Sequence, residues 1–326
     1  MSDYPLVTVC HLCYNNAEYI CEAINAVRET NYPNIQHFVI DDASRPEQVD
    51  VLRGFLEKID ASDINLIVHE TNRGIPASQN HAVELARGKY FIGSISDDLM
   101  IPSRIESDVD CLEESNGNVV GLFAIAEIFH AKIGDGNGHF MGLLEGFSPG
   151  INHTLSSSQL RDMLLKKNFI PAPTVMLKTA WLRANRFDTT YFLEDYPQWV
   201  KVVNEGKSLM YRPEISTYYR RLEQSFSARG RKDYYALRIR QDVIRCRMEL
   251  MKDEQEVHRK FDELRDGIDI FQSDNLRLRR WLLATIRRHR GTGVLYYLAC
   301  CTNRRYLLRF AWYLSKILAG FGSQRI

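Results

Sequence analysis

The chain has 326 residues, of which 45% are hydrophobic and 25% charged, and its formal net charge is +1. This is the composition of an ordinary soluble globular protein, long enough for one large domain or for one domain with an extension. No run reaches the ~18 apolar residues that a membrane-spanning helix needs, and the start, MSDYPLVTV, lacks the basic-then-apolar order of a signal peptide.

Charge is unevenly distributed along the chain. No acidic residue follows Asp274, whereas eleven Lys and Arg residues do, which leaves 31 of the 42 basic residues against 41 acidic ones before position 275. The body is therefore acidic and the tail strongly basic.

Cysteine spacing gives no disulfide or metal framework. The seven cysteines stand at positions 10, 13, 21, 111, 246, 300 and 301. Cys10 and Cys13 form a CxxC, but it lies inside an apolar run and no second CxxC completes a zinc site. We predict reduced, cytosolic thiols.

Short apolar runs alternate with helical patterns in the first hundred residues. Strands are predicted at 6–14, 35–42, 64–70 and 89–96, and helices at 17–29, 46–59 and 76–88. Asn15 or Asn16 is the expected N-cap of the first helix, and Gly88 the C-cap of the last. The alternation predicts a mainly parallel, doubly wound α/β sheet, in which ligands bind beyond the carboxyl ends of the strands. Asp41–Asp42 and Asp97–Asp98 both fall at such ends, so we expect one shared site.

The pattern changes twice further along the chain. Residues 118–130 predict another strand, and the glycine-dense loop at 134–139 fits neither a P-loop nor the dinucleotide fingerprint. A mixed pattern continues to about residue 227, and long, charged helical segments begin at about 232. We place a domain boundary near 228–235.

Four polar clusters could converge on the site: Asp41-Asp42-Ala43-Ser44, Asn72-Arg73-Gly74, Asp97-Asp98 and Glu194-Asp195. Taken singly, a strand-end Asp is more often a helix cap or turn former than a ligand. Two adjacent carboxylates at the mouth of a core are costly unless a cation, a hydrogen-bond donor or a proton relieves them. Asp97 and Asp98 therefore need a partner.

Several stretches, in order, resemble the family-2 glycosyltransferases of the GT-A fold. They are VTVCHLCYNNAEYICEAINAV, NYPNIQHFVIDDAS, NRGIPASQNHAVELARGKYFIGSISDDLMIPSRI, PAPTVM and FLEDYPQWVKVVNEGKSLMYRPEISTYYR, and the likeness covers residues 5–227. The resemblance implies a Rossmann-like, doubly wound mixed sheet with a helical C-terminal extension. It also implies transfer of a sugar, with inversion, from a nucleoside diphosphate sugar, UDP-linked by preference, to a hydroxyl of a glycan or lipid-linked oligosaccharide, as in O-antigen or capsule assembly.

The resemblance divides the chain into functional parts. It implies a catalytic domain at 1–230, whose nucleotide-sugar half ends at about 105 and whose acceptor half occupies about 106–230. Residues 231–326 then form the helical, basic, amphipathic C-terminal region.

The resemblance also assigns the donor side of the site. Asp98 is expected to bind Mn²⁺ or Mg²⁺ and Asp97 the ribose or metal-bound water, in either order, because a hard cation is satisfied by one or two carboxylates plus phosphate oxygens. Asp41 and Asp42 are the expected nucleoside-binding pair, with Asp42 on the base. The other donor-binding candidates are Tyr14, which could stack on the base or simply pack at the strand end, and Arg73.

On the acceptor side, the resemblance assigns the general base to the LEDYPQW stretch. We expect Asp195 to take the acceptor proton and Glu194 to orient it or contact the acceptor. The alternative is that both acids only complement the dipole at a helix start.

Three departures from the family pattern keep a second function open. Ile95 stands where the first Asp of the usual DxDD motif would be, Leu222 replaces a frequent histidine, and Leu12-Cys13 replaces a usual Pro-Thr. Arg220 or Arg221 could supply the positive charge that the histidine would give. The alternative is a catalytically silent sugar-nucleotide or glycan-binding protein, while a nucleotidyltransferase is disfavoured because its glycine- and lysine-rich loop is absent.

The basic tail, residues 276–326, combines Arg with Trp, Leu, Phe and Tyr at roughly helical spacing. This composition favours an interfacial helix on anionic lipid over nucleic-acid binding. We therefore expect a cytoplasmic protein bound peripherally at the inner face of the membrane. A helical pair packed on the catalytic domain is the alternative, and the helices at 234–266 could link the two parts or form a homodimer.

Overall fold

The computed structural model describes residues 4–93, 97–130, 139–144 and 150–221, together with 239, 242–243, 245–247 and 249–251. The chain divides into two compact units, Met1–Asp242 and Val243–Ile326, and the elements named below belong to the first. The predicted boundary at 228–235, the tail, Ile95 and Leu222 lie outside the described residues, as does most of the glycine-dense loop. Within the described ranges, no helix is both long and apolar enough to cross a bilayer.

Strands and helices alternate through the first half of the first unit, as the sequence predicts. The strands are β1 (Val7–Cys13), β2 (Ile35–Asp41), β3 (Ile64–Val68), β4 (Tyr90–Ile92), β5 (Leu99–Met100), β6 (Val119–His130), β7 (His139–Leu144), β8 (His153–Leu155), β9 (Met176–Lys178) and β10 (Ser208–Arg220). The helices are α1 (Ala17–Arg28), α2 (Pro46–Lys58), α3 (Ile75–Leu85), α4 (Arg104–Glu113), α5 (Ser157–Leu164), the 3₁₀ turn η1 (Ala172–Thr174), α6 (Thr179–Ala184) and α7 (Asp195–Asn204).

One mixed sheet joins all the strands. Its order is β3-β2-β1-β4-β9-β6-β10-β5, with β7 paired to β6 and β8 to β10. The pairs β1–β2, β2–β3, β1–β4 and β6–β10 are parallel, whereas β9 runs antiparallel to both β4 and β6. The chain order reverses between β1 and β4, which is the switch point where open α/β sheets bind ligands. The predicted doubly wound mixed sheet is confirmed.

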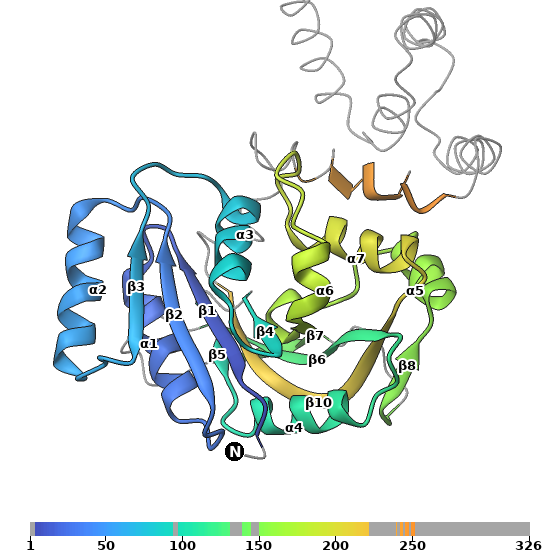
Figure 1. Ribbon diagram of the computed structural model, residues 1–326, viewed down its shortest axis with the longest axis horizontal. Helices are drawn as coiled ribbons and strands as arrows, with labels where there is room; N and C mark the ends of the chain where they lie inside the picture. The colour runs from blue at the N-terminus through green and yellow to red at the C-terminus, as the bar shows by residue number, and fades with distance from the viewer. Residues whose placement is uncertain are drawn as a thin grey trace, which may run out of the picture. The chain divides into compact units, whose positions relative to one another are not determined.

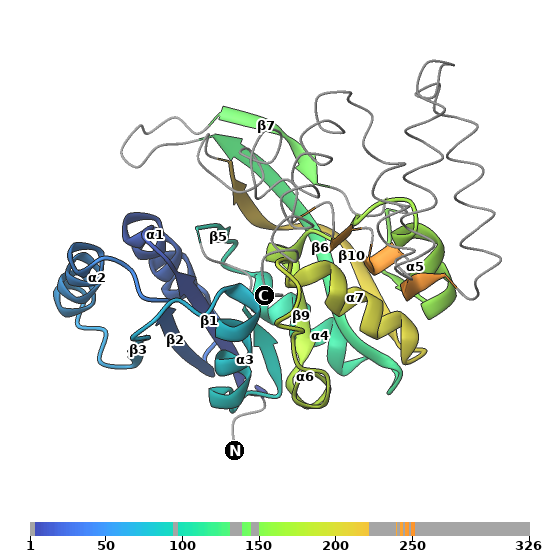
Figure 2. The same cartoon turned by 90° about the horizontal axis from the view of Figure 1, so that it is seen from above.

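Helices cover both faces of the sheet. Figures 1 and 2 show α1 and α2 on one side of β1 and β2 and α3 on the other. Residues of α1 and α4 share a core with β1, β4 and β6, and residues of α1 and α2 share a second core with β1–β3. All seven residues of β1 are buried, because a central parallel strand is covered on both faces. Loops follow the carboxyl ends of the parallel strands β1, β2 and β3.

Two local features differ from the prediction, and a third, the N-cap of α1, is confirmed in position only. The helix α3 ends at Leu85 rather than near Gly88, whose role is different: a Cβ there would lie 2.5 Å from the backbone nitrogen of Thr8, so the close approach to β1 requires glycine. Asn16 occupies the N-cap position of α1 without a side-chain capping bond. The strand β4 ends at Ile92, so Asp97 and Asp98 directly precede β5 instead of ending β4.

Candidate active site

A tight turn follows β2 at Asp41, next to the end of the parallel strand β1. Asp41 is fully buried, and its Oδ1 accepts a 2.8 Å hydrogen bond from the Ser44 backbone nitrogen. The intervening Ala43 has φ 63°, a left-handed conformation that turns the chain sharply. The Ser44 hydroxyl in turn accepts from the backbone nitrogen of Asn15, 2.8 Å away. Tyr14, one residue earlier, is 54% exposed, so its ring is open to a ligand at this edge.

Asp42 anchors the loop between β3 and α3. The carboxylate is buried, and it accepts from the backbone nitrogens of Arg73 at 3.0 Å and Gly74 at 2.8 Å. The His69 ring lies on the same carboxylate, with 2.8 Å between Nδ1 and Oδ1, and Asn72 donates to the Asp42 carbonyl. Burial alone would raise the pKa of Asp42, but these donors lower it below its usual value. Asp42 is therefore an anion, held by the loop that carries the exposed Arg73.

A second histidine extends this chain of hydrogen bonds. His69 Nε2 lies 2.8 Å from Nδ1 of His81 on α3, and the two rings stack with centroids 5.1 Å apart. Burial and the neighbouring His69 lower the pKa of His81. Asp42, His69 and His81 thus connect the end of β2, the end of β3 and α3.

Asp97 and Asp98 lie against Arg220 at the end of β10. The antiparallel pairing of β5 with β10 brings the segments together, with Tyr218 opposite Leu99. The Arg220 backbone nitrogen donates to Asp98 Oδ1 at 2.8 Å, and Arg220 Nε donates to the Asp97 carbonyl at 2.9 Å. The guanidinium also pairs with Glu22 of α1.

The two carboxylates are short of compensating charge. Burial, and then the charge of Asp97, raise the pKa of Asp98 well above its ordinary value, and burial raises that of Asp97. Arg220 opposes both shifts without cancelling them. Adjacent buried carboxylates in this state are stabilised by a cation.

A divalent cation fits these residues. Asp97 and Asp98 offer the hard oxygen donors that Mg²⁺ and Mn²⁺ prefer. Among the described residues, no three His, Cys, Asp or Glu side chains converge, so such an ion would complete its coordination with water and with phosphate oxygens of a ligand. This is how Mg²⁺ is usually held at phosphate-transfer sites.

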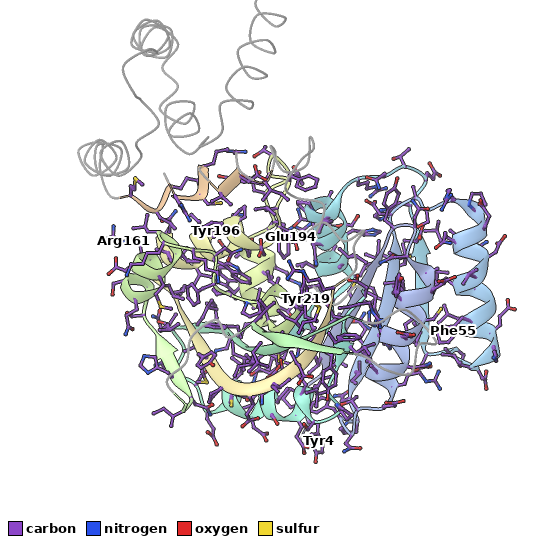
Figure 3. All side chains as sticks on the ribbon, turned by 180° about the vertical axis from the view of Figure 1, so that it is seen from behind. Tyr4, Phe55, Arg161, Glu194, Tyr196 and Tyr219 are labelled. Atoms are coloured by element: carbon purple, nitrogen blue, oxygen red, sulfur yellow. The ribbon has the colours of Figure 1, made fainter. Side chains whose placement is uncertain are left out.

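The third acidic pair, Glu194 and Asp195, stands at the start of α7, where Figure 3 labels Glu194 beside Tyr196. Asp195 Oδ2 accepts from Asn168 Nδ2 at 2.8 Å, and its Oδ1 accepts from the Tyr196 backbone nitrogen at 2.6 Å. Burial, and then the charge of Asp195, raise the pKa of Glu194 to about 8, while burial also raises the pKa of Asp195. The two acids are adjacent but differ in their donors.

Asp195 lines a cavity beside the end of β4. The other lining residues are Gln79, Phe91, Gly93, Val175, Leu177, Phe187 and Trp199. Gly93 directly follows β4 and is the last described residue before Asp97 in the chain. The rest of the lining is mostly apolar, so Asp195 is the one ionisable side chain in it.

A buried ion network fixes the cavity wall at Val175. Arg104 donates to the carbonyls of Pro173 at 2.7 Å and Val175 at 3.2 Å, and it pairs with Asp108 at 3.2 Å. Asp108 also binds Arg212 of β10 at 2.9 Å. The PAPTV segment, which contains η1, is therefore held by Arg104 of α4, and Asp108 connects that arginine to Arg212 of β10.

Sequence reasoning identified the acidic pairs but missed their partners. The structure brings Asp41, Asp42 and the Arg73 loop together, and it joins Asp97–Asp98 to Arg220, one of the two arginines expected to supply positive charge. His69, Asn168 and Glu22 were not expected. His69 follows β3 at the carboxyl edge, which is a usable signal, whereas no spacing marks the other two.

Comparison with known proteins identifies the family of the first part of the chain. The family Glycosyl transferase family 2 matches residues 8–153. A curated uncharacterized glycosyltransferase from Methanocaldococcus jannaschii is 26% identical over 204 residues, which are 62% of this chain and 66% of that protein. TuaG of Bacillus subtilis, named for teichuronic acid biosynthesis, is 31% identical over 110 residues, 34% of this chain and 43% of its own. The chain thus spans less than two thirds of either relative.

Two solved glycosyltransferases share the fold. The mannosyltransferase PcManGT from Pyrobaculum calidifontis, in complex with GDP-Man and Mn²⁺, is 16% identical with a TM-score of 0.55, covering 91% of this chain and 86% of its own. S. aureus TarS in complex with UDP-GlcNAc is 16% identical with a TM-score of 0.54, covering 83% and 75%. Residues 8–153 are therefore a glycosyl transferase family 2 domain, within a chain that has the GT-A fold.

Proposed function

We propose that the chain is an inverting glycosyltransferase that moves a hexose or N-acetylhexosamine from a nucleoside diphosphate sugar, UDP-linked by preference, to a hydroxyl of a glycan or lipid-linked oligosaccharide. The observation that carries the proposal is the Asp97–Asp98 pair, in which Asp98 is buried, beside Arg220 at the end of β10. The proteins of the same fold that hold GDP-Man with Mn²⁺ and UDP-GlcNAc support it.

The nucleotide would lie along the carboxyl edge of β1 and β2. The exposed Tyr14 ring offers a stacking face for the base, and the Asp41–Asp42 turn fixes the edge against which the nucleoside packs. The Asp42 oxygens already accept from the Arg73 loop, so Asp42 acts on the donor both through any contact with the base and through the position of that loop. Arg73 lies on this exposed loop and is the proposed contact to the diphosphate.

The diphosphate would be bound at Asp97 and Asp98. These residues would hold Mn²⁺ or Mg²⁺, which when bound supplies positive charge to the departing diphosphate. Arg220 holds the carboxylate pair in place through the Asp98 carboxylate and the Asp97 carbonyl, and it adds a fixed positive charge. Its guanidinium lies 5.1 Å from the Tyr19 ring centroid and 4.9 Å from that of Phe129, so it is confined by packing.

Asp195 is the proposed general base. The acceptor oxygen would attack the anomeric carbon on the face opposite the leaving diphosphate, and this single displacement inverts the configuration. Asp195 would take the acceptor proton as the new C–O bond forms and the bond to the diphosphate breaks. Two donors hold the Asp195 carboxylate in the cavity wall, and Glu194 beside it would contact the acceptor.

Calorimetric titration tests the donor site. UDP, GDP, UDP-GlcNAc and GDP-Man are titrated into the full chain with Mn²⁺, with Mg²⁺ and with EDTA. We expect at least one diphosphate to bind with metal and to lose affinity in EDTA, and the absence of metal-dependent binding for all four would overturn the metal-assisted proposal. Turnover of the bound sugar nucleotide then separates an enzyme from the silent binding protein.

We also propose that residues 276–326 bind the inner face of the cytoplasmic membrane, where a lipid-linked acceptor would be reached. Each of the eleven basic residues near an anionic surface contributes about 1 kcal/mol, and the Trp281 and Trp312 segments add apolar contact. The full chain should float with phosphatidylglycerol vesicles at low salt and detach as salt is raised. If it ignores those vesicles at low salt, the tail is instead a packing or dimerisation element.

A further inference from the structure

We propose that Asn168 is the positioning residue that makes Asp195, and not Glu194, the base of the acidic pair. Asn168 precedes η1 in the chain, 27 positions before Asp195, and its Nδ2 donates to Asp195 Oδ2 at 2.8 Å. The inference rests on the proposed function for its catalytic consequence. The positioning itself can be measured without any sugar transfer.

The geometry leaves the Asp195 carboxylate oriented but still able to accept a proton. One oxygen accepts from Asn168 and the other from the Tyr196 backbone nitrogen at 2.6 Å. An ionised carboxylate has about four acceptor positions, so two donors fix its plane without filling it. Because Asp195 also lines the cavity, the remaining lone pairs are available to a hydroxyl that enters there.

The orientation that lets Asn168 Nδ2 donate to Asp195 leaves the amide oxygen of Asn168 without a donor in the described part of the chain. Its Oδ1 is buried and accepts no hydrogen bond from the described residues. A buried carbonyl without a donor destabilises a fold, and such groups in native proteins call for an explanation. The explanation here is that Nδ2 must face an anion, since the opposite amide orientation would direct Oδ1 at the Asp195 carboxylate.

Glu194 is the member of the acidic pair that has no donor comparable to Asn168 in the part of the chain that the structure describes. It neighbours Asp195 in the chain, yet no side chain among the described residues donates to it, and burial with the adjacent charge raises its pKa to about 8. Burial also raises the pKa of Asp195, but Asn168 and the Tyr196 backbone nitrogen oppose that shift, and Glu194 has no such side-chain donor within the described ranges. A proton that the pair retains is therefore favoured on Glu194, and a protonated Glu194 cannot serve as a base.

One further buried carboxylate lies close to the pair. Asp242 Oδ2 accepts from the backbone nitrogens of Phe192 at 2.6 Å and Leu193 at 2.9 Å, just before Glu194. The lining of the cavity contains no charged side chain other than Asp195, and Arg161 and Asp162 of α5, which packs on α7, pair with each other at 3.4 Å. Asp242 is unchanged in every variant tested below, so a change in the ionisation of Asp195 there reports on Asn168.

The test is a titration of the full chain labelled with ¹³C at the Asp side-chain carboxyl carbons, with the Asp195 signal assigned by its loss in Asp195→Asn. Asn168→Ala removes a donor from the anion and should raise the pKa of Asp195 by about 1 to 2 units. Asn168→Asp keeps the shape but adds a like charge, so it should raise that pKa further. The isosteric variant keeps the test valid should the alanine variant fail to fold.

The matched control is Asn185→Ala. Asn185 Nδ2 donates to Glu205 Oε2 at 3.1 Å, an amide–carboxylate bond at the opposite end of α7, and its removal should leave the Asp195 pKa unchanged. An Asp195 pKa that is the same in wild type and both Asn168 variants would overturn the positioning role. In the transfer assay, the acid limb of the pH profile should move upward by the same amount as the pKa. If the pKa moves but no donor is ever turned over, the positioning holds and the proposed function fails.

Discussion

Two Asp-Asp pairs lie beside strands in this chain, Asp41–Asp42 at the end of β2 and Asp97–Asp98 just before β5, and they have opposite environments. Asp42 is 6% exposed and Asp98 4%, so both are taken out of water to the same degree. The pKa of Asp42 is lowered and that of Asp98 is raised well above its usual value. The difference lies in the donors: Asp42 accepts from His69 and two backbone nitrogens, whereas Asp98 accepts from one backbone nitrogen and has Asp97 beside it.

Burial alone therefore does not decide what an Asp-Asp pair beside a strand does. Where the protein supplies the donors, as at Asp42, the carboxylate completes a loop and is stable as an anion. Where the protein compensates the charge only in part, as at Asp97 and Asp98, the pair is the proposed cation site. Glu194 and Asp195 show the same contrast between neighbouring residues. Among the described residues, a side chain donates a hydrogen bond to Asp195 and none donates to Glu194.

The largest expected effect is at this third pair. Asp195→Asn should reduce sugar transfer by about 10²–10⁴-fold with donor affinity retained, because the amide fills the space but cannot accept the proton. Glu194→Gln mimics the protonated acid and should keep activity within about tenfold at neutral pH by the same reasoning. Single-turnover transfer rates measure both. If Glu194→Gln is the more damaging change, the base has been assigned to the wrong member of the pair.

Metal-dependent donor binding should be the next most sensitive property. Asp98→Asn removes a proposed cation ligand and should weaken Mn²⁺-dependent nucleotide binding by about 100-fold, while leaving the metal-free fold intact because it also removes a buried like charge. Asp63→Asn, at an exposed position before β3, is the control. Calorimetry with and without Mn²⁺ gives the affinities, and equal values for Asp98→Asn and wild type would contradict the assignment.

The same substitution at the other pair should act on stability. Asp42→Asn replaces one carboxylate oxygen with an N–H₂ group, which faces the Gly74 backbone nitrogen at the Oδ2 position, or the Arg73 backbone nitrogen and the His69 ring at the Oδ1 position. We expect the free energy of unfolding in urea to fall by about 2–3 kcal/mol. For Asp98→Asn, measured without metal, the free energy of unfolding should fall by less than this or not at all. Equal losses at the two sites would mean that the donor difference is energetically irrelevant.

The sequence was sufficient for the regular half of the fold and for the acids of the site. Strand–helix alternation predicted the sheet of β1–β4 because each strand is a short apolar run and each helix has a clear apolar face. Identity alone could not distinguish Asp42 from Asp98. Their donors come from residues 27 to 122 positions away, which only the folded chain brings near. The Arg104–Asp108–Arg212 network was missed for the same reason, although the i, i+4 spacing of its first two members on α4 was readable.

The pH dependence of stability should also separate the donor-rich site from the donor-poor one. Glu194 has its pKa raised from 4.5 to about 8, so its contribution is fully present below the ordinary value and is lost as the pH rises through about 8. Asp42 has a lowered pKa, so its contribution is present above its ordinary value and is lost as acid approaches the lowered one. Glu194→Gln should match wild type in Tm at pH 5 and exceed it at pH 9. A difference that stays constant from pH 5 to 9 would contradict the raised pKa.

The smallest expected effect concerns His81, which acts on Asp42 only through His69. Because Asp42 is an acceptor, His69 donates from Nδ1, so its Nε2 accepts and His81 donates from its own Nδ1 across 2.8 Å. His81→Ala removes that last donor at a partly exposed position where water can replace it, so stability should fall by only about 0.5–1 kcal/mol. In the Asp42→Ala background, where His69 has lost its acceptor, the same change should cost almost nothing more, since coupled members of one hydrogen-bond network are not additive. A double-mutant cycle in urea unfolding measures the coupling, and an unchanged cost of His81→Ala in the Asp42→Ala background would show that the two histidines are merely stacked and do not support the carboxylate.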